Sequence, residues 1–146
     1  MTAKEFLYQG FSLDRLIQND MLEIERLRGL AESIPSTLII GSNVQSSVPN
    51  DRVCNTVMKI VDLSNQVDDD INEYIELKRI IRKTIKRVQN LELRLILHRR
   101  YVNLEKWEKI AVDLGYSYQW VIKLHGRGLV EFEEKNKHFL VEYDKK

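Results

Sequence analysis

The chain is short of the residues that interrupt helices, because its 146 residues include only two prolines and six glycines. It has a single cysteine, Cys54, which excludes an intrachain disulfide and fits a reducing compartment. It also lacks a run of about 18 apolar residues, so we expect no membrane span. The first residues do not show a basic segment followed by an apolar core, so we expect no secretory signal. A cytoplasmic, all-α protein is the resulting expectation.

The sequence also lacks the usual signatures of catalysis and metal binding. There is no glycine-rich phosphate loop ending in Lys-Ser or Lys-Thr. His98, His125 and His138 do not have ligand spacing, and no cysteine pair accompanies them. The carboxylates fall on the solvated faces of the expected helices, so no acid–base pair is evident. We therefore expect no enzyme activity, no cofactor and no bound metal.

The charge is distributed unevenly along the chain, although the net charge is only +1. Residues 1–77 contain six Lys/Arg and thirteen Asp/Glu, whereas residues 78–127 contain thirteen Lys/Arg and four Asp/Glu. A basic block inside a neutral chain is typical of a segment that binds a polyanion. A solvated helix face would give the same composition, so charge alone leaves both interpretations open.

Two long helices are predicted by apolar residues that recur at steps of three and four. The first begins at the capping box Thr2–Glu5 and should end before Pro35. Its stripe is Leu13, Ile17, Ile24, Leu27, Ala31 and Ile34, and that of the second helix, about 53–88, is Val57, Ile60, Ser64, Val67, Ile71, Tyr74, Lys78, Ile81, Ile85 and Val88. A polar loop over 35–52 should join them. We expect residues 1–89 to form a long antiparallel coiled-coil hairpin for oligomerisation or partner binding.

The segment 107–129, WEKIAVDLGYSYQWVIKLHGRGL, has the pattern of a helix-turn-helix. Ala111 is small where a second helix would cross close above the first. Gly115 suits the positive φ of a tight turn, and Ser117 suits the cap of the next helix. We therefore expect a helix-turn-helix DNA-binding domain over residues 90–132, whose second helix spans 117–130, followed by a tail over 133–146.

The second helix of this motif should carry the residues that touch DNA, because the apolar positions Val121, Leu124 and Leu129 face inward. In a helix-turn-helix, the N-terminal residues of the second helix reach base edges in the major groove. The residues expected to bind DNA are Ser117, Tyr118, Gln119, Trp120, Ile122, Lys123 and Arg127; further phosphate contacts are expected at Arg99, Arg100, Lys106 and His125. Among them, Gln119 suits a bidentate contact to adenine. The alternative is an ordinary helical hairpin whose exposed aromatic residues bind protein.

The segment 91–132 resembles the fourth conserved region of bacterial sigma factors, which reads the upstream promoter element. The signature is Trp107, Ile110, Ala111, Leu114, Gly115, Ser117, Val121, Leu124 and Leu129. The whole chain is similar to the ArpU and RinA families of phage late-gene regulators, notably at MTAKEFL and VMKIVDLSNQVDDDI. The resemblance implies a phage or prophage transcription regulator working in the cytoplasm of a bacterial host. The positions that match the base-reading Arg and Glu residues of sigma factors differ here.

Three functions follow as expectations. The first is a sequence-specific DNA-binding transcription regulator that acts as a homo-oligomer, with a dimer favoured. The second is a DNA-recognition subunit of a phage packaging machine, similar to a small terminase, which a ring of many subunits would favour. The third is an adaptor whose sigma-like domain binds host RNA polymerase more than DNA. The basic segment 78–87 could touch either DNA or polymerase.

Overall fold

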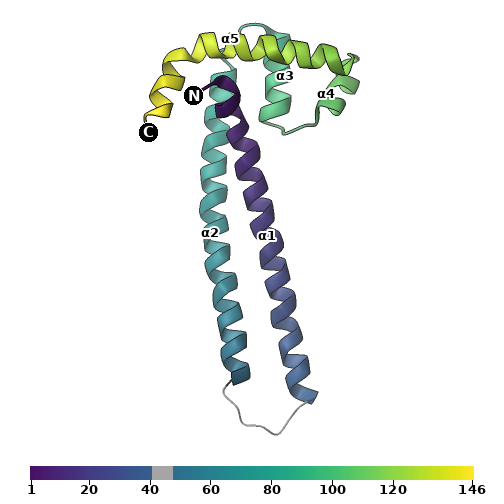
Figure 1. The fold of residues 1–146 in the computed structure, drawn as a ribbon, viewed down its shortest axis with the longest axis vertical. Coiled ribbons are helices and arrows are strands. Elements are labelled where there is room, and N and C mark those ends of the chain that lie inside the picture. Colours follow the sequence, from purple (N-terminus) through teal and green to yellow (C-terminus); the bar gives the residue numbers. More distant parts are fainter. Residues whose placement is uncertain (41–47) are drawn as a thin grey trace. The chain divides into compact units, whose positions relative to one another are not determined.

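Five helices and no strand make up the part of the chain that the structure describes, in agreement with the predicted all-α class. This computed structural model describes the backbone of residues 1–40 and 48–146 and the side chains of residues 1–33 and 51–146. In chain order the helices are α1 (Ala3–Ile40), α2 (Val48–Ile85), α3 (Leu91–Tyr101), α4 (Trp107–Leu114) and α5 (Tyr118–Asp144), as Figure 1 shows. None of these helices has the length and apolar character needed to cross a membrane.

The chain divides into two compact units that share the two long helices. The first, called here the C-terminal unit, consists of Met1–Leu13 together with Tyr74–Lys146, and the second, called here the middle unit, is Asp14–Glu73. The expected boundary after residue 89 does not coincide with this division. The start of α1 and the end of α2 contribute apolar side chains to the same core as α3, α4 and α5.

The start of α1 has the capping box that the sequence predicts. The backbone amide of Glu5 donates to Thr2 Oγ1 at 3.2 Å, and the amide of Thr2 donates to Glu5 Oε2 at 2.8 Å. These two bonds satisfy backbone donors that the first turn of a helix leaves without a partner. The bond from the Thr2 amide also lowers the pKa of Glu5, because it favours the charged form of the carboxylate.

The predicted end of the first helix at Pro35 is wrong, because α1 continues to Ile40. A proline ring fixes φ at about −65°, which is a helical value, so a helix can pass through it at the cost of one backbone hydrogen bond. The second helix also begins earlier than expected, at Val48, and ends at Ile85. What remains of the expected loop 35–52 is residues 41–47, which lie outside the described residues.

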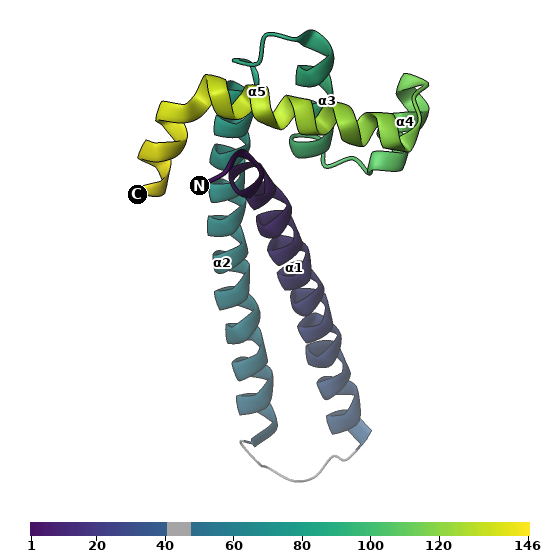
Figure 2. The ribbon, with the colours of Figure 1, turned by 45° about the horizontal axis from the view of Figure 1, so that its top comes forward.

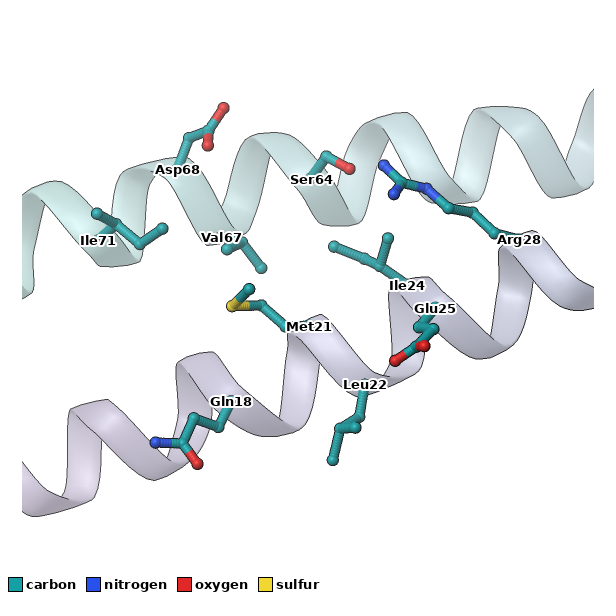
Figure 3. Close-up of a pocket in the computed structure, with 10 residues that line it drawn as sticks. All are labelled: Gln18, Met21, Leu22, Ile24, Glu25, Arg28, Ser64, Val67, Asp68 and Ile71. Carbon is teal, nitrogen blue, oxygen red and sulfur yellow. The ribbon is translucent and has the colours of Figure 1, made fainter.

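In the middle unit the segments of α1 and α2 lie side by side, as Figures 1 and 2 both show. Ile17, Ile24 and Val67, three members of the predicted apolar stripes, are buried there. In Figure 3 the side chains of Met21 and Ile24 point toward α2, and Val67 points toward α1. The two helices leave an open groove of about 790 Å³ between them. Val57, another member of the predicted stripes, is 47% exposed, so the stripes are buried only in part.

The core of the C-terminal unit joins the first residues of the chain to the last. The ring of Phe6, which is fully buried, lies 6.2 Å from that of Phe132, 5.3 Å from that of Phe139 and 5.0 Å from that of Tyr143. Aromatic pairs at such centroid separations stabilise a core beyond the area that they bury. Most of the expected tail over 133–146 therefore continues α5, which ends at Asp144, and Phe139 and Tyr143 pack against Phe6 at the start of α1.

A buried asparagine connects the end of α2 to α5. Asn136 Nδ2 donates to the carbonyl of Thr84 at 3.2 Å and to that of Phe132 at 2.9 Å, and its Oδ1 accepts from Arg87 at 3.0 Å. The backbone of α5 departs from helical geometry at this residue, with φ −117° and ψ 16°. The kink thus coincides with a polar side chain whose hydrogen-bonding groups are all satisfied, as burial requires.

Candidate nucleic-acid interface

The candidate interface is built on the turn between α4 and α5. Gly115 ends α4 in the left-handed conformation, with φ 70° and ψ 27°, and its amide donates to the carbonyls of Ala111 and Val112. Ser117 then caps α5, because its side chain accepts the backbone amide of Trp120 at 3.1 Å. Both local predictions, the positive φ at Gly115 and the cap at Ser117, are confirmed. The direction in which α5 starts is set by these two residues.

Apolar packing holds this turn and the first turns of α5 in place. Ile110 and Val121 are fully buried, and Ala111 and Leu124 are 4% and 3% exposed. Farther along the same side of α5, a Cβ at Gly128 would lie 3.3 Å from Leu97 Cγ, so the side chain of Leu97 on α3 packs directly against the backbone of α5. The inward positions predicted from the sequence are therefore confirmed, and the start of α5 has a rigid support.

The opposite side of α5 exposes the residues predicted to contact DNA, which we call the reading face. All seven members are exposed: Ser117, Tyr118, Gln119, Trp120, Ile122, Lys123 and Arg127. The guanidinium of Arg127 lies over the ring of Trp120, 5.5 Å from its centroid. A large ring that stays 38% exposed beside two cationic side chains is unusual for a helix whose other face is packed. The face combines hydrogen-bonding, aromatic and positive groups over the first turns of the helix.

The positive character of the reading face ends within α5. Three carboxylates, Glu131, Glu133 and Glu134, follow Arg127. The side chain of Glu131 is directed at the start of α3, where Oε1 accepts the amides of Gln89 and Asn90 at 2.7 and 3.3 Å. A polyanion would therefore be attracted to the first turns of α5 and not to its second half.

The structure corrects the expectation that His125 contacts phosphate. His125 is buried, and its Nε2 lies 2.7 Å from the hydroxyl of Tyr101. Burial, together with the charges of Lys4 and Arg100, lowers the pKa of His125 to about 4. An imidazole that is neutral at pH 7 and enclosed by protein cannot neutralise a phosphate. In the sequence, His125 is a residue that can carry a positive charge two positions before Arg127. In the folded helix it lies on the buried side, with Val121, Leu124 and Gly128.

The predicted phosphate contact at Arg99 is also wrong, because two carboxylates already pair with this guanidinium. Its Nε donates to Glu105 Oε2 at 2.6 Å, and its second nitrogen bonds Asp113. The bonds from Arg99 and Lys109 together lower the pKa of Glu105 to about 2, with the larger effect from Arg99. This cluster ties α3 to the turn before α4 and to α4 itself. The charge of Arg99 is therefore balanced by carboxylates of the protein itself.

Arg100 is held by the protein as well, whereas Lys106 remains exposed. Arg100 donates to the carbonyl of Glu105 at 2.9 Å, and its guanidinium lies 4.5 Å from the ring centroid of Phe11 and 4.6 Å from that of Trp107. Cations over aromatic faces stabilise folded chains when partly desolvated. Of the four residues expected to contact phosphate, Lys106 is the one whose side chain is exposed.

Two residues, one in the turn and one at the start of α3, escaped the sequence prediction. Tyr116, in the turn itself, is 37% exposed, and its hydroxyl bonds the carboxylate of Glu92. Asn90 caps α3 by accepting the amides of Glu92 and Leu93 at 3.0 and 3.1 Å. The signal for Asn90 was available, because asparagine before an apolar run favours a helix start. Tyr116 gave no signal, since its partner lies 24 residues away.

No family model, no curated protein and no solved structure matches this chain. Among the described residues, no group of three or more His, Cys, Asp and Glu could hold a metal ion.

Proposed function

We propose that this chain binds double-stranded DNA by placing the start of α5 in the major groove, and that it regulates transcription. The observation that carries the proposal is the reading face: a capped, rigidly supported helix start that exposes Gln119, Trp120 and Lys123. The major groove admits an α-helix, and glutamine can read adenine through two hydrogen bonds. In this interpretation α4, the turn and α5 form a helix-turn-helix.

The charge of the C-terminal unit favours a polyanionic partner. It contains eighteen Lys/Arg and eleven Asp/Glu, a net charge of +7. Arg99 and Arg100 are engaged within the protein, but the exposed cations Lys106, Lys123 and Arg127 remain near the turn and on α5. Each phosphate that such a residue neutralises releases counterions, which makes binding favourable at low salt.

The resemblance to the fourth region of sigma factors and to phage late-gene regulators fits this proposal. It points to a phage transcription regulator, in which the paired segments of α1 and α2 form a coiled-coil hairpin. We propose that this hairpin joins copies of the chain into a homo-oligomer, because several reading faces would lengthen the DNA sequence that is recognised.

The test is selection from a random pool of DNA duplexes with the full chain at two salt concentrations, followed by sequencing. We expect an enriched motif that contains adenine at the position facing Gln119. Binding that enriches no sequence and disappears at the higher salt would contradict sequence-specific regulation. It would favour a packaging subunit or a polymerase adaptor.

The variant Gln119→Ala makes the selection sharper. It removes two hydrogen bonds to one base but no charge, so the preference at one motif position should fall by roughly tenfold or more. Affinity for unrelated duplexes should stay near the wild-type value. The matched control is Gln89→Ala, an exposed glutamine outside α5. An equal loss on all sequences for Gln119→Ala would refute base reading by this residue.

A further inference from the structure

A second groove lies in the C-terminal unit between α2 and α3, and no residue of α4 or α5 lines it. Its volume is about 300 Å³. The polar residues that line it are all basic or imidazole side chains, Arg82, Lys86, Arg94 and His98, and the exposed apolar ones are Leu91 and Leu95. We call it the basic groove. It is separate from the reading face, which belongs to α5.

The two leucines of the basic groove are unusually open to solvent. Leu91 is 73% exposed and Leu95 is 45% exposed, and they are one helical turn apart on α3. Leu95 is framed by Arg94 and His98, and Arg94 is oriented by a bond from its Nε to the carbonyl of Val88 at 2.8 Å. Apolar anchors inside a ring of cations suit an apolar helix face edged with carboxylates.

The middle unit presents that complementary chemistry on α2. Met58 and Val61, one turn apart, are 63% and 51% exposed. Asp62 and Asp69 follow at helical spacing and are also exposed. We call these four residues the acidic face. The middle unit has five Lys/Arg and eleven Asp/Glu, a net charge of −6, against +7 for the C-terminal unit.

We propose that the basic groove of one copy binds the acidic face of α2 in a second copy. Leu91 and Leu95 would cover Met58 and Val61, while Arg82 and Lys86 would meet Asp62 and Asp69. The opposite net charges favour this contact, whereas two middle units of charge −6 repel each other. The contact refines the self-association in the proposed function and does not depend on DNA binding.

This contact joins two different surfaces. After one contact a pair of copies keeps one unused groove and one unused face, and these either bind each other in a closed pair or bind further copies to give a ring or an open chain. The association should weaken as salt rises, because the opposing charges on the rim are exposed to solvent.

The test is sedimentation velocity of the full chain over a range of concentrations at low and high salt. In one variant, Arg82→Glu/Lys86→Glu reverses the charge of the basic groove. In the other, Asp62→Lys/Asp69→Lys reverses the charge of the acidic face. The wild type should associate at low salt. Each variant alone should need at least roughly tenfold more protein to associate. An equimolar mixture of the two variants should regain association, because the intact groove of one variant meets the intact face of the other.

Two controls complete the experiment. Lys135→Glu/Lys137→Glu reverses two exposed charges on α5 outside the groove and should associate like the wild type. Circular dichroism checks that each variant is folded, and a misfolded variant cannot restore association in the mixture. A wild type that stays monomeric at every concentration would overturn the proposal, as would a mixture that fails to pair. So would a reversed groove that loses DNA affinity while self-association is unchanged, because the groove would then hold DNA phosphate.

Discussion

At the scale of single residues, some polar side chains of this protein form hydrogen bonds or ion pairs within the fold, whereas others are exposed to solvent. His125 and Lys123 lie two positions apart on α5, yet the first is buried against Tyr101 and the second is exposed. A helix advances about 100° per residue, so neighbours in sequence meet different surroundings. The chemistry of each residue then follows from the side of the helix on which it lies.

The burial of His125 predicts a specific dependence of stability on pH. The unfolded chain binds a proton at His125 near the ordinary pKa of 6.5, whereas the folded imidazole stays neutral down to about 4. In that window the unfolded state holds more protons, so the free energy of unfolding should fall as the pH falls, by at most about 1.4 kcal/mol per unit from this residue. Urea unfolding at pH 7.0, 6.0 and 5.5 measures this slope.

His125→Gln should flatten part of this slope. His98 should retain a smaller share, since burial and nearby Arg82 also lower its pKa. The matched control is His138→Gln, because His138 is an exposed residue of the same helix. If wild type and His125→Gln showed the same slope, the imidazole would not be held neutral by burial.

Lys123 predicts a change in the salt dependence of DNA binding. If it neutralises one phosphate, Lys123→Ala should lower the slope of log affinity against log salt by about 0.9. The control is Lys137→Ala, an exposed lysine in the later part of the same helix, which should leave the slope unchanged. Fluorescence anisotropy with one duplex at several salt concentrations decides between the two outcomes. Equal slopes for all three proteins would remove Lys123 from the interface.

At the scale of elements, the turn between α4 and α5 depends on backbone conformation. A side chain at Gly115 would meet no heavy atom within 4 Å, so the strain of a substitution there is confined to its φ of 70°. The left-handed region costs an L-residue roughly 1–2 kcal/mol. The positive φ alone therefore makes glycine the preferred residue at this position.

Two alanine substitutions with opposite expected signs test this account. Gly115→Ala should lower the free energy of unfolding by about 1–2 kcal/mol. Gly126→Ala should raise it by about 0.5–1 kcal/mol, because Gly126 is an exposed helical residue with nothing within 4 Å of an added Cβ. Chemical denaturation gives both values. A neutral Gly115→Ala would show that the turn tolerates another backbone conformation.

At the scale of the whole molecule, the candidate DNA-binding unit requires the first residues of the chain. Phe6 is fully buried among rings of α5, more than 120 residues later in the sequence. Phe6→Ala should therefore cost about 3–5 kcal/mol, the usual range for a buried phenylalanine. Both tryptophans, Trp107 and Trp120, belong to this unit, so their fluorescence follows its unfolding.

Leu22→Ala provides the comparison for Phe6→Ala. Leu22 is an apolar residue of α1 in the middle unit and is 66% exposed, so its loss should change stability by less than about 0.5 kcal/mol. Similar stabilities for the two variants would contradict the packing of the N-terminus against α5.

The sequence by itself determined the features that depend on near neighbours along the chain. The capping box at Thr2, the positive φ at Gly115 and the cap at Ser117 involve residues within one helical turn, and the apolar stripes follow helical periodicity. The exposed set of the reading face was predictable for the same reason. Its binding to DNA stays a prediction, since exposure shows only that these residues are available.

Only the tertiary structure decided the features that depend on partners distant in sequence. The burial of His125 beside Tyr101 and the packing of Phe6 on α5 join residues 24 or more positions apart. The ion pair between Arg99 and Asp113 spans 14 positions. The extension of α1 beyond Pro35 also escaped the local rule, because the proline's fixed φ is compatible with a helix. Local preference sets where helices start and which side is apolar. Desolvation and ion pairing, which arise only when helices meet, decide which charges remain free to act.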